Sequence, residues 1–244
     1  MPGEELQQHF RQRLWDSDIR YFQAAAQNID MLGGQLSFME GLSSQAGACV
    51  FHSIGTLPSH EVSWLQALET NFVQRGVRRS RLYLQENRPE DEAFLKLNGY
   101  RPIIELGMAG PATSEKLETG LEPLELQPVR EALWPLHRHL LSSCDSAPDG
   151  HRMQADDYAT LERRKVEAGY MQLFLYLEDG KAQAIASLDI KQDFARTKNL
   201  LIHPARRGEG LGKGLVASLM AIAKRQGATA MGAYALSENQ AAYE

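Results

Sequence analysis

Residues 199–226 constrain the fold more than any other part of this sequence. Residues 199–203 read as a short apolar strand that Pro204 ends, and a loop with three glycines in five residues follows. Residues 211–226 then carry apolar side chains at helical spacing and stop at Gly227. A strand that turns through glycines into a helix directs several backbone N–H groups, and the positive end of the helix dipole, toward one point. The segment therefore predicts a binding site for a pyrophosphate.

Two other phosphate-binding loops contain such glycines, but their spacing does not match. A Walker loop needs Gly six residues before its Lys and Ser or Thr directly after it, whereas Arg207 and Gly214 occupy these positions around Lys213. The dinucleotide-binding fingerprint needs a third glycine three residues after the second, and the two possible glycine pairs place Lys213 or Leu215 there. Spacing excludes both motifs.

The loop does resemble the acetyl-coenzyme A motif of the GNAT superfamily, (Arg/Gln)-x-x-Gly-x-(Gly/Ala), which Arg207, Gly210 and Gly212 match. The strand end at Ile202 and Pro204 and the long amphipathic helix after the loop are similar to that family as well. The resemblance implies a GNAT-type acetyltransferase domain, with acetyl-CoA as co-substrate and an amine as the acetyl acceptor.

The same resemblance implies a set of cofactor-binding residues. The loop backbone would hold the pyrophosphate, and the main chain near Leu201 and Ile202 would face the thioester, where one N–H would stabilise the oxyanion. In this family the strand before the loop and the strand after its helix, here residues 199–203 and 230–236, splay apart around the pantetheine arm. The implied cofactor-binding residues are Leu201, Ile202, Arg207, Gly208, Glu209, Gly210, Leu211, Gly212, Lys213 and Asn239.

The end of the sequence resembles the start of a second family signature, Asn-x-x-Ala, through Asn239 and Ala242. Asn239 would approach the pantetheine or the phosphates, and it is also suited to cap a helix. The tyrosine that often serves as general acid in the family would follow one turn later, and Tyr243 stands too early for that role. We expect either a truncated chain or another segment that completes the sheet.

The general base is equally open. Asp189, Asp193 and His203 lie near the predicted site, and an amine must lose a proton during attack. A turn position for Asp193 and a strand-capping role for His203 favour structural functions. The catalytic residues are therefore left unassigned.

The amino-terminal half resembles a GNAT-like fold without its cofactor site, with an unrelated α/β domain as the alternative. Residues 82–87 and 94–100 are similar to the family's closing segment of strand, Asn, helix and Gly-aromatic pair. Residues 55–61, after a predicted strand, lack the basic residue and the paired glycines of a phosphate loop. We predict two tandem GNAT-like domains of the α/β (α+β) class, at 1–118 and 119–244, each a mixed, mostly antiparallel sheet flanked by helices.

Periodicity predicts the elements of both domains. The polar, Gly- and Pro-containing stretch 107–128 reads as the connection between them. The predicted helices are 14–28, 61–74, 89–97, 129–141, 155–168 and 211–226. The predicted strands are 36–39, 46–54, 81–84, 103–108, 170–177, 182–190, 199–203 and 230–236.

Composition limits the class of protein. The net charge of −5 argues against a nucleic-acid-coating surface, although residues 191–213 hold six basic side chains against two acidic ones. No run approaches the roughly 20 apolar residues of a membrane span, so we expect a cytoplasmic protein without a membrane partner. Cys49 and Cys144 are too few for a disulfide framework, and no metal site is expected. His137 and His139 point about 200° apart on a helix and cannot share a metal.

The sequence thus predicts an N-acetyltransferase whose acceptor is unknown. Two alternatives stay open: a non-catalytic acyl-CoA-binding or sensor protein, and an interaction scaffold in which neither half binds nucleotide. The oligomeric state is not predicted.

Overall fold

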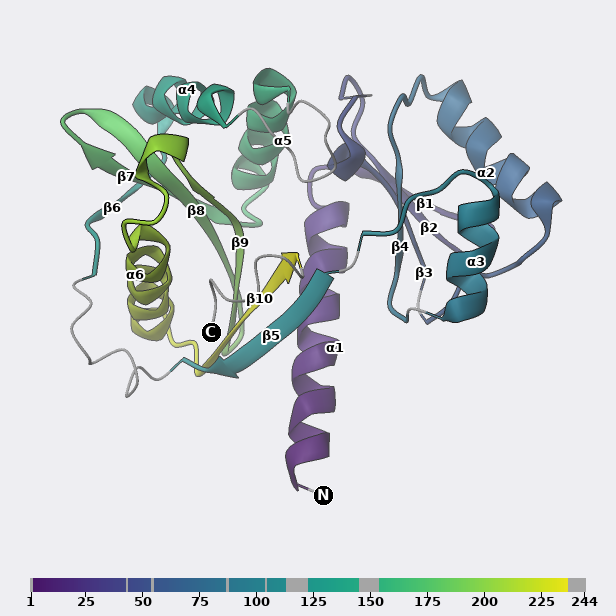
Figure 1. Cartoon of the computed structure of the whole chain (residues 1–244), viewed down its shortest axis with the longest axis horizontal. Helices are drawn as coiled ribbons and strands as arrows, with labels where there is room; N and C mark the ends of the chain where they lie inside the picture. Colours follow the sequence, from purple (N-terminus) through teal and green to yellow (C-terminus); the bar gives the residue numbers. More distant parts are fainter. Residues whose placement is uncertain are drawn as a thin grey trace. The chain divides into compact units, whose positions relative to one another are not determined.

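The computed structural model describes residues 2–42, 44–53, 55–86, 88–103, 105–112, 123–144 and 154–236 (Figure 1). The chain divides into two compact units: Asp18–Ile104 is one, and Met1–Ser17 with Glu105–Glu244 is the other. Helix α1 (Pro2–Gln23) contributes residues to both. Among the described helices, none has the length and apolar character that a membrane crossing requires.

The unit of residues 18–104 is built on a four-stranded sheet in the order β1-β2-β3-β4. Its strands are β1 (Gln27–Met31), β2 (Gly34–Phe38), β3 (Cys49–Ser53) and β4 (Arg81–Leu84). The first three are antiparallel, and β4 runs parallel to β3 after the crossover helix α2 (Val62–Gln74). Helix α3 (Pro89–Leu97) follows β4, with Pro89 in its first turn.

One face of this sheet packs against α2. Leu65, Leu68 and Phe72 of α2 are buried at helical spacing, whereas Val62 and Val73 of the same helix are exposed. Strand β3 contributes Cys49 and Phe51 to the cluster around Leu68 and Phe72. The alternate residue His52 stacks on Phe22 of α1, which therefore covers the opposite face.

The other unit contains a six-stranded sheet in the order β5-β10-β9-β8-β7-β6. Its strands are β5 (Glu105–Pro111), β6 (Leu126–Pro128), β7 (Gln172–Glu178), β8 (Lys181–Lys191), β9 (Phe194–Ile202) and β10 (Ala230–Leu236). Only β9 and β10 are parallel among these pairs, and α6 (Leu211–Arg225) is the crossover between them. A hairpin turn at Asp179 and Gly180 joins β7 to β8, and both residues have positive φ.

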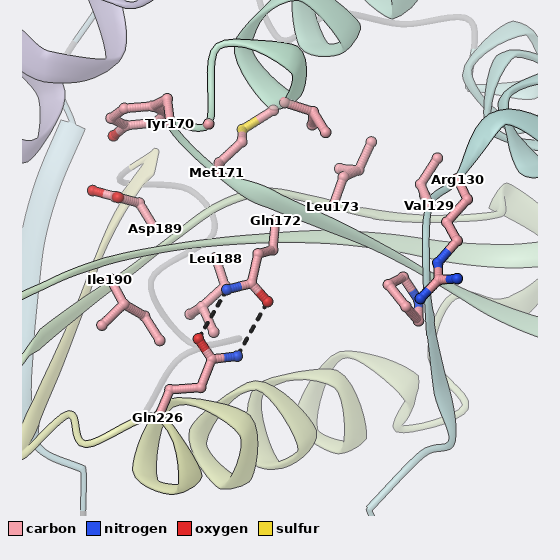
Figure 2. A pocket seen from close by; sticks show the side chains of 13 residues that line it. Val129, Arg130, Tyr170, Met171, Gln172, Leu173, Leu188, Asp189, Ile190 and Gln226 are labelled. Atoms are coloured by element: carbon pink, nitrogen blue, oxygen red, sulfur yellow. Dashed lines mark hydrogen bonds between the residues drawn. The ribbon is translucent and has the colours of Figure 1, made fainter.

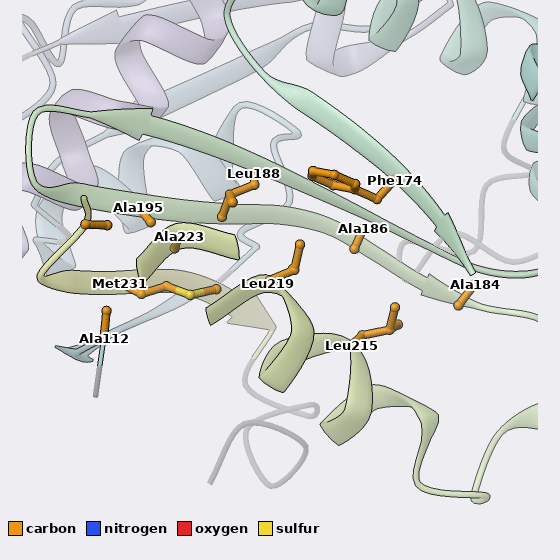
Figure 3. Packing of buried hydrophobic residues seen from close by; sticks show 11 residues of the cluster. Ala112, Phe174, Ala184, Ala186, Leu188, Ala195, Leu215, Leu219, Ala223 and Met231 are labelled. Atoms are coloured by element: carbon orange, nitrogen blue, oxygen red, sulfur yellow. The ribbon is translucent and has the colours of Figure 1, made fainter. Parts of the chain in front are cut away.

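Helices cover both faces of this sheet (Figure 1). Helix α6 packs Leu215, Leu219 and Ala223 against Ala186 and Leu188 of β8 (Figure 3). On the opposite face, α4 (Trp134–Ser143) and α5 (Ala155–Glu167) cover Ile185, which directly precedes Ala186 in β8 and so points to the other side of the sheet. The sheet is thus a buried layer between helices. The loops that follow its strands lie at the sheet's ends, outside this layer.

The two units share one topology. In each, three antiparallel strands are followed by a crossover helix and a fourth strand parallel to the third. Each sheet is mixed and mostly antiparallel, with helices on its faces, which confirms the predicted fold class. The position of the domain boundary at residue 118 stays a prediction, and the compact units differ from it because β5 belongs to the six-stranded sheet.

Several predicted boundaries are wrong. The first helix begins at Pro2 rather than at residue 14 and ends at Gln23, because residues 27–31 form β1. The segment predicted as a connection holds the last residues of β5 and all of β6. Strand β9 begins at Phe194, not at residue 199, and α4 begins at Trp134 after a short 3-10 turn.

Candidate functional site

The loop between β9 and α6 has the backbone conformation that its glycines allow. Pro204–Arg206 form one 3-10 turn, and the Nδ1 of His203 accepts a hydrogen bond from the Ala205 N–H at 3.3 Å. Gly208 and Gly210 then adopt φ values of 84° and 82°, and a Cβ at either position would meet nothing within 4 Å. These glycines are required by the left-handed backbone rather than by neighbouring atoms, and the space around them is open to a ligand.

Helix α6 begins directly at this loop with an N-terminus that no side chain caps. Gly210 is the N-cap residue in a left-handed conformation, and its carbonyl accepts from the N–H groups of Lys213 and Gly214. The first N–H groups of a helix lack intrahelical partners and carry its positive dipole end. The exposed side chains of Arg207 and Lys213 add two cationic groups at this point. The site therefore has the donors and the charge that a pyrophosphate needs.

Arg206 has a bracing function that sequence analysis did not identify. Its Nε donates to Glu209 at 2.7 Å, and its Nη1 pairs with Glu178 at the end of β7. These two carboxylates raise the pKa of the Arg206 guanidinium above its usual value. Arg206 thus connects the loop to the sheet, while the neighbouring Arg207 has another orientation.

The carbonyl of Ile202, the last residue of β9, is contacted from two sides. Arg207 Nε donates to this oxygen at 3.4 Å, and the buried Cys144 thiol at the end of α4 lies 3.7 Å from it. Burial raises the pKa of Cys144, so the thiol acts here as a neutral donor. Arg207, the arginine of the predicted motif, therefore contacts the end of β9, where the predicted thioester-facing residues Leu201 and Ile202 lie.

Strands β9 and β10 separate along their length. Among the described residues they pair at Phe194↔Ala230, Ala195↔Met231 and Arg196↔Gly232, whereas β9 continues to Ile202 and β10 to Leu236. Residues 199–202 and 233–236, which do not pair with each other, belong to the strands predicted to splay, whereas residues 230–232 of the same prediction pair with β9. They diverge toward the end of the sheet from which the glycine loop leaves.

The free edge of β10 is covered by a segment from earlier in the chain. Strand β5 pairs antiparallel with β10 along its whole length, from Pro111↔Ala230 to Glu105↔Leu236. Strand β5 thus extends the sheet beyond β10.

The three candidates for a general base lie in different places. The Asp193 carboxylate accepts from Arg13 at 2.5 Å and from Thr229 at 3.0 Å, which lowers its pKa to about 2. His203 caps the 3-10 turn of the loop, so the structure shows a structural role for both residues.

Asp189 lines a pocket of 530 Å³ with Arg130, Tyr170 and the hydrogen-bonded amides of Gln172 and Gln226 (Figure 2). No residue of the 203–213 loop lines this pocket. It is therefore separate from the candidate phosphate site.

The structure brings together the predicted residues from Leu201 to Lys213 at the end of β9 and the start of α6. Gly212 and Gly214 have packing functions: a Cβ on Gly212 would lie 3.4 Å from Ile202, and one on Gly214 would lie 3.0 Å from Leu124. Asn239 lies outside the described residues.

Comparisons with known proteins agree with this geometry. The family model of the GNAT acetyltransferases matches residues 129–244. A functionally unknown conserved protein from Staphylococcus epidermidis has 11% identity and a TM-score of 0.65, over 89% of this chain and 86% of its own. A GCN5-related N-acetyltransferase from Kribbella flavida has 16% identity and a TM-score of 0.58, over 91% of this chain and 84% of its own. No curated protein matches the sequence. Residues 129–244 are therefore a domain of the GNAT acetyltransferase family, in a chain whose fold is similar to that of a GCN5-related N-acetyltransferase over most of its length.

Proposed function

We propose that the domain of residues 129–244 transfers an acetyl group from acetyl-CoA to an amine. The observation that carries this proposal is the separation of β9 and β10 after three residue pairs, next to a glycine loop and an uncapped helix N-terminus. A phosphate site alone would suit many ligands. A phosphate site beside two diverging strands suits a ligand with a pyrophosphate and a long, extended arm.

The loop from Arg207 to Lys213 would hold the pyrophosphate through backbone N–H groups and its two cations. The arm would lie between β9 and β10. The His203 N–H donates to the carbonyl of Gln183 in β8, and Leu201 pairs with Ile185 of the same strand. Backbone groups of successive strand residues point to opposite sides, so the Ile202 N–H points away from β8. It is the donor best placed to stabilise an oxyanion on the thioester carbonyl.

In the proposed reaction the amine nitrogen attacks the thioester carbonyl carbon. A C–N bond forms, the C–S bond breaks, the nitrogen loses a proton and the thiolate of coenzyme A takes one. The loop and the strand backbone bind and polarise the donor, and the acceptor is an amine of unassigned identity.

Binding of coenzyme A and acetyl-CoA to the full chain, measured by calorimetry, tests the cofactor site. Gly210→Val should weaken binding at least about tenfold, because the side chain imposes strain at positive φ and projects into the phosphate space. Gly227→Val is the matched control, since Gly227 also has positive φ (91°) with open space but lies at the other end of α6. Equal losses in both variants would contradict the proposal.

Turnover separates this function from the alternatives. Release of coenzyme A from acetyl-CoA with a panel of small amines and peptide amino termini is expected from an acetyltransferase. Binding without turnover of any amine would instead support an acyl-CoA sensor, and the absence of binding would support a scaffold.

A further inference from the structure

Three side chains from different elements form a hydrogen-bonded chain on the α4 and α5 side of the sheet. The Nε2 of His137 in α4 lies 2.7 Å from Oε2 of Glu162 in α5, and both side chains are fully buried. The other carboxylate oxygen, Oε1, accepts from Nδ2 of Asn199 in β9 at 2.7 Å. Glu162 therefore uses both oxygens to join a helix to a strand.

Asn199 occupies a bulge in β9. Ser187 pairs with Lys198 and Ile185 with Leu201, so the single residue between them on β8 faces two residues, Asn199 and Leu200. Asn199 has a φ of 57°, a left-handed conformation in which one residue can interrupt a strand. The hydrogen bond to Glu162 thus holds the side chain of the residue that makes the bulge.

The bulge lies at the position where β9 leaves β10. The last pair between these strands is Arg196↔Gly232, three residues before Asn199, and Leu201 and Ile202 follow two and three residues after it. A bulge bends its strand and increases the local twist. The direction of the Ile202 N–H therefore depends on the conformation of Asn199.

Stabilisation of the fold does not by itself explain the hydrogen-bonded chain of His137, Glu162 and Asn199. A buried ionisable pair is often no more stabilising than an apolar pair of the same volume, but it fixes orientation because each oxygen requires its partner. Glycine would adopt the left-handed conformation at lower cost than asparagine, although it would leave the bulge unattached. Both comparisons favour a role in orientation.

We propose that His137, Glu162 and Asn199 are positioning residues that fix the β9 bulge and thereby orient the backbone of Leu201 and Ile202 toward the acyl thioester. This inference rests on the proposed function for the identity of the ligand, whereas the fixing of the bulge does not depend on it. None of the three residues contacts the reacting atoms in this proposal.

Amide hydrogen exchange on the full chain tests the fixing of the bulge without any ligand. Asn199→Gly keeps the left-handed backbone and removes the hydrogen bond, so the amides of residues 199–202 should exchange at least about tenfold faster, with 194–197 unchanged. Glu162→Gln retains an oxygen acceptor for Asn199 and should exchange like the unaltered protein. Gln192→Gly, at another non-glycine residue with positive φ (57°), is the matched control in the turn between β8 and β9.

Acetyl-CoA labelled with ¹³C at the thioester carbonyl tests the orientation. Polarisation by a backbone N–H should move the carbonyl resonance downfield on binding to the unaltered protein and to Glu162→Gln. Asn199→Gly should lose most of this shift while its Kd for coenzyme A changes less than about threefold, because the phosphate loop is intact.

The outcomes are separable. Unchanged exchange in Asn199→Gly, or equal loss in Glu162→Gln, would overturn the fixing of the bulge by these hydrogen bonds. Faster exchange with an unchanged carbonyl shift would overturn the role toward the thioester. If the unaltered protein binds no acetyl-CoA, the proposed function fails and the thioester role fails with it, while the exchange result still decides whether the three residues fix the bulge.

Discussion

The Arg13 guanidinium lies 2.5 Å from the Asp193 carboxylate and joins the first part of α1 to the turn between β8 and β9. The hydrogen bond from Arg13, with a second from Thr229, lowers the pKa of Asp193 to about 2. The unfolded chain has an aspartate pKa of about 3.9, so this stabilisation is complete above that value and is lost as pH falls toward about 2. The difference in free energy of unfolding between the protein and Asp193→Asn should therefore shrink from pH 5 to about 2. A difference that stays constant with pH would contradict this.

Lys165 of α5 gives a pH dependence of the same sign in an alkaline range. Its side chain is fully buried, and burial, with a smaller effect of Lys198, lowers its pKa to about 7. An unfolded lysine has a pKa of about 10.4, so between about 7 and 10 the unfolded chain binds more protons and stability rises with pH. The Lys165→Met variant should gain stability relative to the unaltered protein as pH falls from about 10 to 7. Parallel stability curves for the two proteins would show that the lysine is not desolvated.

The glycines of the loop should differ from other glycines in their response to alanine. Gly208→Ala and Gly210→Ala should each lower the free energy of unfolding by about 1 kcal/mol, because alanine is strained in the left-handed region. Gly110→Ala in β5 is the control, since its Cβ would also meet nothing within 4 Å and its φ is not positive. Denaturant unfolding measures all three. Equal effects at 110 and 210 would show that the loop backbone has another conformation.

Both cysteines should be unreactive in the folded protein. Cys49 and Cys144 are buried, and burial raises the pKa of Cys49 to about 12 and that of Cys144 above its usual value. Because the thiolate is the nucleophile, an aromatic disulfide reagent at pH 8 should titrate neither thiol before denaturation and both after it. Single alanine variants assign any rapid reaction to one residue. A thiol that reacts at once in the native protein would contradict this burial.

Local periodicity predicted the bounds of some helices and strands correctly. The bounds of β4, α3 and β10 agree with the prediction at both ends, and those of α3 are marked by Pro89 at its start and by Asn98 and Gly99 after its end. The glycine loop was also predictable, since spacing distinguishes its motif from two others. Most strands of the two sheets followed from the same patterns, whereas β1 and β6 were not predicted.

Features that depend on distant residues were not predictable. Residues 2–13 carry only Leu6 and Phe10 as large apolar side chains, and this sparse pattern was too weak to predict that α1 begins at Pro2. His137 and Glu162 lie 25 residues apart on separate helices, and their hydrogen bond exists only once both helices cover the sheet. The positive φ of Asn199 could not be predicted from the sequence, because asparagine also occurs at helix caps and in turns.

The pairing of β5 with β10 has a consequence for any attempt to isolate the acetyltransferase domain. A fragment cut at residue 129 would lack β5 and would leave the backbone of β10 from Ala230 to Leu236 without its antiparallel partner. An uncovered edge strand is a template for intermolecular pairing. A fragment that begins at residue 129, the first residue of the family match, should therefore self-associate. A fragment meant to stay monomeric has to begin upstream of Glu105 so that it includes β5.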